Sequence, residues 1–480
     1  MTGSVTLAAS VPELILSIGA LVLLLVAAWR GDEASRGVSW AAAALFVAAS
    51  VSLMGAPSHA GSAYGGLYRA DAFAGFAKLL IYIASAVSVV LAPAWFSRSG
   101  VMRAEYPVLI LLSATGMGIM ASAGDLLTLY VGLELQSLAA YVLASFMRRD
   151  LRSAEAGLKY FVLGALASGI LLYGISLLYG FTGTTQFSGL HAAVAGRGLS
   201  TGILFGLVFV LAGLAFKISA VPFHMWTPDV YEGAPTPVTA FFASAPKVAA
   251  MALMVRVTVE AMGPATDAWR QIIIFTSLAS IVLGAVAAIG QTNIKRLLAY
   301  SSINNVGFAL LGLAAGTPEG VSSVLIYMTV YIAMTLGSFL CIIRMRDLNG
   351  DPIEAIAALS GLSRTRPALA AALGMFMFSL AGIPPLFGFY PKLAVFSAAT
   401  NAGLFWLAVA GAVGSVVGAY YYLKIVKTMY FDEPAAPLEK SDDKLVGGLI
   451  AVSAIAISPL GYLAIPMLSA ATFVAAKALF

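Results

Sequence analysis

Apolar stretches of about 20 residues, separated by short polar segments, run along almost the whole chain. A helix needs about 20 residues to cross the hydrocarbon core of a bilayer, and backbone in lipid must satisfy its own hydrogen bonds. The pattern therefore predicts an all-α polytopic membrane protein without strands. It indicates fourteen spans, at 11–29, 38–56, 72–95, 105–122, 126–147, 156–180, 201–221, 237–260, 269–289, 297–315, 321–343, 367–391, 402–426 and 445–468.

Lysines and arginines alternate between the loops that join these spans. The even-numbered loops hold only Arg69, Arg197 and Arg270. Cytoplasmic loops carry the excess of positive residues, so we expect the odd-numbered loops to be cytoplasmic and both termini to lie on the opposite, periplasmic face. The odd-numbered loops hold Arg30, Arg36, Arg98, Arg103, Arg148, Arg149, Arg152, Lys295, Arg296, Arg344, Arg346, Arg364, Arg366, Lys427, Lys440 and Lys444.

Two of the predicted spans are broken. In the seventh, Ser219 and Pro222 interrupt the apolar run just after Lys217, and in the twelfth the segment 382–388 does so just before Lys392. The two breaks lie five spans apart, and a five-helix unit repeated in tandem would insert its second copy upside down. We therefore expect one membrane domain with two inverted repeats, built from helices 1–3 (1–104), repeat one with helices 4–8 (105–260), repeat two with helices 9–13 (269–428) and helix 14 (445–480).

Composition supports a membrane protein and excludes several kinds of site. Of 480 residues, 60% are hydrophobic and 10% are charged, against about 25% charged in a soluble domain. Iron–sulfur clusters and structural zinc need about four ligands. No nucleotide-binding glycine loop is present. The only cysteine and histidines are Cys341, His59, His191 and His224, so we expect no metal or cofactor in this chain. The net charge of +5 comes from loop residues, so we expect no nucleic-acid partner.

Ionisable residues inside the apolar spans are the strongest functional signal. Glu134, Lys217 and Lys247 fall within the fifth, seventh and eighth spans, where a charge costs about 2.5–3.5 kcal/mol on insertion scales. Burial makes a lysine easier to deprotonate, whereas a nearby carboxylate stabilises its charged form. Glu134 is the natural partner for these lysines, and the three residues suggest a proton path. The alternative is a static ion pair that fixes helix packing.

Other charges lie closer to span ends. Lys392 follows the second break, and irregular backbone at that depth lines a cavity, although a lysine there can also extend to the interface. Lys159, near the cytoplasmic start of the sixth span, fits either role equally well. An interfacial position is favoured for Glu13, Lys78, Arg256 and Lys424.

Polar segments beside the breaks add candidates for proton uptake or relay. His224 follows the first break and relays protons or bonds to loop carbonyls, while Asp229 and Glu232 form a cytoplasmic mouth or a solvated loop. The tenth span opens with hydroxyls and amides that hold a water chain or bond between helices: Tyr300, Ser301, Ser302, Asn304 and Asn305.

The segments 216–238 and 295–302 resemble the antiporter-like subunits of respiratory complex I, the NADH:quinone oxidoreductase. The run Pro228-Asp-Val-Tyr-Glu-Gly-Ala-Pro235 is similar to the form found in subunit N. The resemblance covers nearly the whole chain. It implies discontinuous helices 7 and 12 and a role in proton translocation for Glu134, Lys217, Lys247, Lys392 and Lys159.

The same resemblance implies a membrane, neighbouring subunits and cofactors held elsewhere in the complex. The chain would lie in the bacterial inner membrane, among lipids and beside membrane-arm subunits on the M, K, J, A and H side. NADH, FMN, iron–sulfur clusters and quinone would be held by other subunits. Two alternatives stay open, namely a subunit of an Mrp-type cation/proton antiporter and a purely structural membrane subunit.

Overall fold

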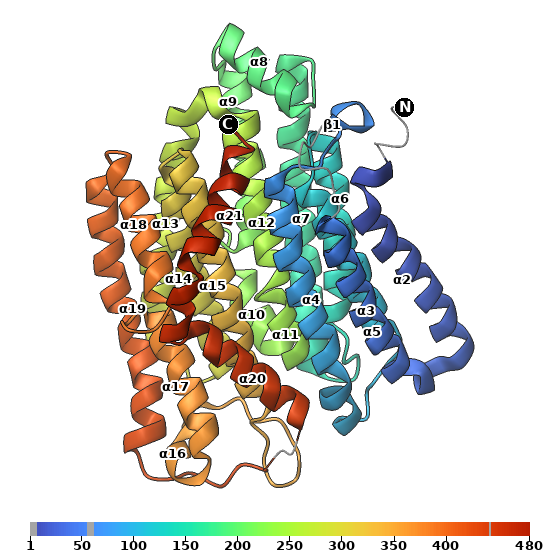
Figure 1. Cartoon of the computed structure of the whole chain (residues 1–480), viewed down its shortest axis with the longest axis vertical. Coiled ribbons are helices and arrows are strands. Elements are labelled where there is room, and N and C mark those ends of the chain that lie inside the picture. The colour runs from blue at the N-terminus through green and yellow to red at the C-terminus, as the bar shows by residue number, and fades with distance from the viewer. Residues whose placement is uncertain (1–6, 55–61, 441–442) are drawn as a thin grey trace.

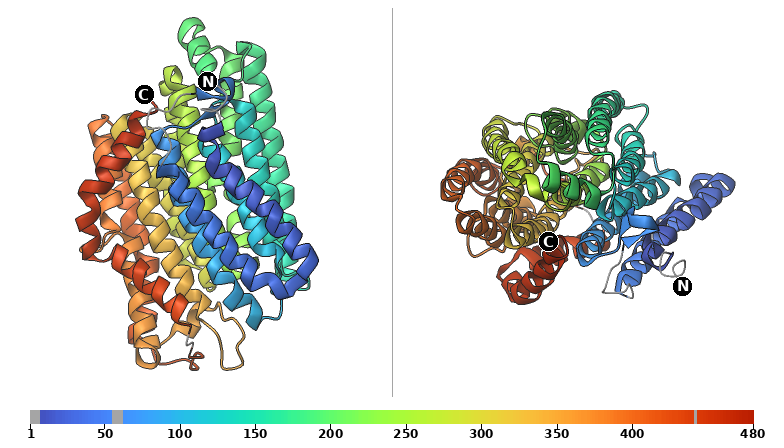
Figure 2. Two further views of the ribbon diagram at one scale, coloured as in Figure 1. Left: turned by 45° about the vertical axis from the view of Figure 1, so that its right-hand side comes forward. Right: turned by 90° about the horizontal axis from the view of Figure 1, so that it is seen from above.

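Long, roughly parallel helices make up nearly all of the structure, a computed structural model that describes residues 7–54, 62–440 and 443–480 (Figure 1). His59 and the end of the second predicted span lie outside the described residues. Viewed from above, α2 and α3 stand at one side of the bundle and α18 and α19 at the opposite side (Figure 2).

Each of the fourteen predicted ranges holds helix in the described structure. Eleven helical segments there are long and apolar enough to cross a membrane, and α5, α17 and α20 are shorter apolar helices. The helix α10 Trp226–Gly233 lies between the seventh and eighth ranges, in a segment predicted as a loop. The helices in or overlapping the predicted ranges are α2 Val11–Arg30, α3 Ser35–Met54, α4 Ala72–Arg98, α5 Glu105–Ala121, α6 Leu126–Ala144, α7 Leu151–Thr182, α9 Thr201–Ile218, α11 Thr236–Phe242, α12 Ala245–Val255, α13 Thr266–Ile289, α14 Ile294–Ala314, α15 Pro318–Ile343, α17 Pro367–Ala381, α18 Phe389–Asn401, α19 Phe405–Phe431, α20 Lys444–Ile457 and α21 Ile465–Lys477.

The connecting loops separate into two groups at opposite ends of the bundle. Odd-numbered loops contact one another, through Arg98–Glu439, Arg103–Asp32 and Arg152–Glu354. Even-numbered loops do the same, through Arg69–Glu260, Gln186–Gly65 and Thr185–Asp125. This alternation is what the charge pattern requires of spans that each cross the bundle once. The number of membrane crossings itself stays a prediction.

Both predicted helix breaks are present. The helix α9 ends at Ile218 and is followed by Ser219 in a left-handed conformation (φ 65°), and α10 begins at Trp226. The helix α17 ends at Ala381 and is followed by Gly382 (φ 79°), and α18 begins at Phe389 and runs to Asn401, ten residues beyond the predicted end at 391. The eighth predicted span is also interrupted, between α11 and α12, and closes with a π-helical turn at Arg256–Ala261.

Further features differ from the sequence prediction. The last span is broken between α20 and α21, where Pro459 opens a 3₁₀ turn that ends at Ala464. Two strands of two residues each, β1 Ser62–Ala63 and β2 Tyr68–Arg69, form an antiparallel hairpin in an even-numbered loop, so the expectation of no strands is wrong. Short helices also lie in loops, α8 Phe187–Arg197 and α16 Leu362–Thr365.

Glycines let several helices approach closely in the interior. A Cβ added to Gly116 on α5 would lie 2.6 Å from the carbonyl oxygen of Gly132 on α6, and one on Gly414 of α19 would lie 2.2 Å from the Ile281 side chain of α13. In lipid there is no hydrophobic driving force between helices, and small residues let the backbones approach closely enough for van der Waals packing to hold them together. Large apolar side chains such as Trp29, Val416 and Leu463 stay exposed on the outer faces, as lipid contact requires.

Candidate functional site

Lys217 lies in the last turn of α9 and reaches α6. Its side chain is 6% exposed, and its Nζ donates to the Ser137 hydroxyl (2.7 Å) and the Tyr141 hydroxyl (3.4 Å). The rings of Tyr141 and Phe216 each lie 5.7 Å from this ammonium, so its charge also faces two aromatic surfaces. Lys217 is thus held at a helix end by neutral groups.

Glu134 lies one turn before Ser137 on α6. Because helical residues three apart share a face, Glu134 and Ser137 face the same side as Lys217. Within the described residues Glu134 and Lys217 form no ion pair within 4.0 Å, and one buried carboxylate oxygen of Glu134 has no hydrogen-bond partner. The expected direct pairing is absent in this conformation. An unpartnered buried acceptor close to a lysine leaves room for a pairing to form and break.

Lys247 is buried in the first turn of α12, with 1% of its side chain exposed. Its Nζ donates to the backbone carbonyl of Ile218 (2.9 Å), the last residue of α9, and to the hydroxyl of Ser219. The last carbonyls of a helix lack intrahelical donors and carry partial negative charge. The break therefore supplies an acceptor to the lysine without a carboxylate.

Lys392 occupies the equivalent place at the second break. Its Nζ donates to the carbonyl of Ala381 (2.8 Å), the last residue of α17, and to the Ser415 hydroxyl of α19 (2.9 Å). The ring of Phe308 lies 4.8 Å away. Gly382 is required next to it, because its φ is +79° and a Cβ there would lie 2.7 Å from the Lys392 Cδ. Lys392 does not extend to an interface.

Buried hydroxyls and amides lie between the first helix break, with Lys247, and the second, with Lys392. The ring of Tyr231 lies 5.9 Å from Lys247 Nζ, and the Tyr231 hydroxyl is buried without a partner in the described part of the chain. On the other side, the Phe308 ring stacks on Tyr327. Tyr300 makes no side-chain hydrogen bond among the described residues. The bonds of the network are Tyr331–Ser302 (2.9 Å), Ser301–Tyr422 (2.5 Å), Asn305–Tyr422 (3.2 Å) and Tyr327–Asn305 (2.7 Å), and Asn304 bonds to the Ile281 carbonyl (2.7 Å).

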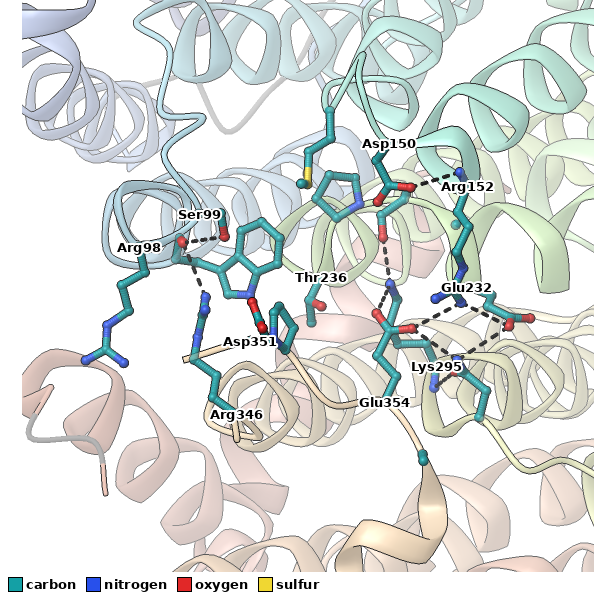
Figure 3. A pocket seen from close by; sticks show the side chains of 18 of the residues that line it. Arg98, Ser99, Asp150, Arg152, Glu232, Thr236, Lys295, Arg346, Asp351 and Glu354 are labelled. Atoms are coloured by element: carbon teal, nitrogen blue, oxygen red, sulfur yellow. Dashed lines mark hydrogen bonds and ion pairs between the residues drawn. The ribbon is translucent and has the colours of Figure 1, made fainter. Parts of the chain in front are cut away.

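A cavity of about 690 Å³ opens at the end that carries the odd-numbered loops, beside the C-terminus of α10 (Figure 3). Glu232, Arg152, Lys295 and Glu354 line it and bond to one another. Lys295 Nζ lies 2.7 Å from Glu354. Burial alone would raise the pKa of Glu354, but the Lys295 charge and hydrogen bonds from Lys295 and Asn293 lower it below its usual value.

Asp229 and Lys159 lie at the edge of this charged region. Asp229 pairs with Arg296 (2.7 Å) and with Lys159 (2.8 Å), and Lys159 also pairs with Glu155 (2.7 Å). The Lys159 side chain is 42% exposed, so the structure sets it apart from the buried Lys217, Lys247 and Lys392. His224 is half-buried in the first break, and its Nδ1 has no partner.

Three of the residues for which we expect an interfacial position are buried inside the protein and ion-paired, so they do not extend to solvent from the bundle. Lys78 (2% exposed) and Glu13 (5% exposed) form a buried ion pair of 2.6 Å. Tyr68 bonds to both, and burial raises its pKa to about 12. Arg256 is fully buried and pairs with Asp71 (2.6 Å) and Glu260 (2.6 Å). Lys424 is exposed, as expected.

The sequence did not predict that Glu13 and Lys78 would pair, nor the hairpin whose Tyr68 bonds to both. Gly118 makes room for the cluster, because a Cβ there would lie 2.5 Å from a Glu13 carboxylate oxygen, but this signal requires knowing that α2 and α5 are neighbours. No three residues of the His, Cys, Asp and Glu types gather as a metal site in the part of the chain that the structure describes.

A bundle with discontinuous helices and buried lysines at their breaks is typical of ion-translocating membrane proteins. Residues 123–418 match the family described as NADH:quinone oxidoreductase/Mrp antiporter, transmembrane. The chain is 69% identical to NADH-quinone oxidoreductase subunit N of Rhizorhabdus wittichii, with all of both chains covered, and 62% identical to that of Sphingopyxis alaskensis, with 98% of each covered.

A solved structure agrees with these relatives. A chain of respiratory complex I from Thermus thermophilus with bound aureothin superposes with a TM-score of 0.81 at 31% identity, covering 95% of this chain and 98% of that one. The chain belongs to the NADH-quinone oxidoreductase subunit N family, the antiporter-like membrane subunits of complex I. It is therefore a multi-pass membrane protein of a respiratory complex.

Proposed function

We propose that this subunit translocates protons across the bacterial inner membrane while other subunits pass electrons from NADH to quinone. One observation carries the proposal. Lys217, Lys247 and Lys392 are buried, make no ion pair among the described residues, and two of them bond to the carbonyl that ends a broken helix. Burying a charge costs free energy, so charges kept at this depth indicate a function. An amine without an ion-pair partner can gain and lose a proton.

Protons enter, in this proposal, from the end with the odd-numbered loops, which the positive-inside rule assigns to the cytoplasm. The cavity beside Glu232 opens the charged loops to water, and Asp229 lies at its edge. His224, with an unpartnered ring nitrogen in the first break, relays protons toward Lys217 and Lys247. Both termini would then lie in the periplasm.

The middle of the path crosses from the first break to the second. The hydroxyls of Ser302, Tyr331, Ser301 and Tyr422, with Asn305, supply donors and acceptors between Lys247 and Lys392. Release follows from Lys392 to the face of the even-numbered loops. The five-helix repeats, 105–260 and 269–428, would place the two breaks in inverted orientation around this path.

Glu134 acts as the switch in this proposal. A change in neighbouring subunits brings its free carboxylate oxygen to Lys217 or withdraws it, which alters the proton affinity of the lysine. Moving one proton against 100 mV costs about 2.3 kcal/mol. A hydrogen bond to a charged group contributes about 1.5–3 kcal/mol, so one such rearrangement is of the required size.

The setting follows from the family. We infer neighbours among the membrane-arm subunits on the M, K, J, A and H side, contact with lipids, and NADH, FMN, iron–sulfur clusters and quinone bound by other subunits. Lys159 is exposed and doubly paired in the isolated chain. We propose that it functions where α7 meets a neighbouring subunit.

The test replaces Lys217 or Glu134 with alanine in the assembled complex, reconstituted in vesicles. Protons translocated per electron pair should fall while NADH oxidation by the peripheral subunits continues. Lys424→Ala, which removes an exposed lysine, is the matched control. Unchanged stoichiometry in both Lys217→Ala and Glu134→Ala would falsify the proposal, and weak assembly with normal stoichiometry would indicate a structural role.

A further inference from the structure

The break between α20 and α21 lies directly against the break between α17 and α18. The Phe387 N–H donates to the carbonyl of Ile457 (2.8 Å), the last residue of α20. The Tyr462 hydroxyl donates to the carbonyl of Leu386 (3.2 Å). The C-terminal broken helix therefore supplies the acceptor for the Phe387 N–H and a second donor to the Leu386 carbonyl, which also accepts from the Phe389 N–H (3.1 Å).

Aromatic packing fixes the same contact. The Phe387 ring meets Tyr462 edge to face, with 5.3 Å between ring centroids, and stacks parallel to Tyr390 at 5.8 Å. Gly461 allows this approach, because a Cβ there would lie 2.8 Å from the Phe387 ring. The Tyr390 hydroxyl bonds in turn to Ser469 of α21 (2.9 Å). The segment 386–390 is held on one side by α20 and α21.

Lys392 lies on the other end of this segment. It follows Phe387 by five residues, and its ammonium returns to the Ala381 carbonyl on the far side of the break. The path of residues 382–391 therefore sets how far Lys392 lies from its acceptor. A shift of Tyr462 or Ile457 moves the backbone that carries Lys392, although neither residue touches the lysine.

The first break is tied in a corresponding way. The Val221 N–H donates to the Ser280 hydroxyl of α13 (2.9 Å). The helix α13 is the ninth predicted span and α20–α21 the fourteenth, so the helices that hold the two breaks are five spans apart, as the breaks are. Of the two, only the C-terminal helix is itself discontinuous: its acceptor, the Ile457 carbonyl, ends α20, and its donor, the Tyr462 hydroxyl, lies in the 3₁₀ turn that follows.

We propose that Tyr462, together with the Ile457 carbonyl, positions Lys392 by locking the second helix break to the C-terminal broken helix. This inference rests on the proposed function of Lys392. Tyr462 is a positioning residue, because it acts through residues 386–392 and contacts neither Lys392 nor the hydroxyl network. Movement of the C-terminal helix would be transmitted to the protonation of Lys392.

The experiment compares Tyr462→Phe with Thr472→Val in the full complex. Tyr462→Phe keeps the ring against Phe387 and removes only the bond to Leu386. Thr472 lies on α21 and bonds to Ser322 of α15 (2.9 Å), away from the break. We expect Tyr462→Phe to shift the pH profile of proton-coupled quinone reduction by on the order of half a pH unit, and Thr472→Val to leave it unchanged.

A double variant separates this inference from the proposed function. If Tyr462 acts through Lys392, then Tyr462→Phe adds no shift in a Lys392→Ala background. A loss of stoichiometry in Lys392→Ala with no shift in Tyr462→Phe overturns the positioning role alone. Unchanged stoichiometry in Lys392→Ala overturns the proposed function. Ser469→Ala, which frees Tyr390, tests the same lock should Tyr462→Phe not assemble, and an unshifted profile there also overturns it.

Discussion

Lys247 and Ile218 meet across the first helix break, with the lysine Nζ 2.9 Å from the carbonyl oxygen that ends α9. Lys392 and Ala381 repeat this relationship at the second break, at 2.8 Å. The lysine comes from a different helix in the first case and from the continuation of the same broken helix in the second. The acceptor, a free terminal carbonyl, is the shared element. Each break thus gives a lysine a hydrogen-bond acceptor in addition to interrupting the helix.

The hydroxyl network between the two breaks should be sensitive to Tyr422. Tyr422→Phe removes the partner of both Ser301 and Asn305. Losing one such buried bond costs about 0.5–1.5 kcal/mol, so we expect proton translocation in vesicles to fall roughly two- to tenfold. Tyr421→Phe is the matched control, because the neighbouring Tyr421 hydroxyl is buried without a partner. Equal rates in the two variants would exclude a relay through Tyr422.

The Glu13–Lys78 pair should stabilise the packing of α2 on α4. Glu13→Gln leaves the Lys78 charge buried without a carboxylate, and breaking a buried pair costs about 3–5 kcal/mol. We expect a lower midpoint in thermal unfolding of the purified complex. Glu13→Gln combined with Lys78→Met should recover much of the loss, since an apolar replacement removes the unpaired charge. Glu319→Gln, at an exposed carboxylate, is the control.

Glu354 should make the loop end of the subunit sensitive to acid. Its pKa is lowered in the folded state by Lys295 and Asn293, so its contribution to stability is fully present above its ordinary pKa of 4.5 and is lost as pH falls through the lowered value. We expect Glu354→Gln to lower the unfolding midpoint at pH 7 and the difference from wild type to shrink below about pH 4.5. A difference that stayed constant with pH would contradict this assignment.

The sequence was sufficient for the features that depend on local pattern. Runs of apolar residues placed most helices within a few residues, although α18 and α21 run well past the predicted span ends, and Ser219 and Gly382 marked the two predicted breaks. The break in the last span was missed because the span was drawn through Ser458-Pro459, although proline near mid-span was visible, and the interruption between α11 and α12 was also missed. The lysines were predicted from the cost of burying a charge, which depends on depth and needs no tertiary structure.

Contacts between distant segments could not be predicted in the same way. Ser137 takes the hydrogen bond expected for Glu134, because one helical turn decides which group Lys217 reaches. Glu13 and Lys78 lie close to span ends in the sequence, yet the 62–69 hairpin covers them and Gly118 leaves space for the carboxylate. Neither fact is visible without knowing which helices are neighbours.

The contact between Phe387 and Ile457 has a consequence for how the chain is made. Seventy residues separate the two, so at about 5–20 residues per second the ribosome reaches Ile457 roughly 4–14 s after Phe387. During that interval the Phe387 N–H lacks its final partner, and an unsatisfied group in lipid costs several kcal/mol. Insertion of α17 and α18 is therefore completed only when the last helix arrives, and biosynthesis of the Lys392 site ends with it.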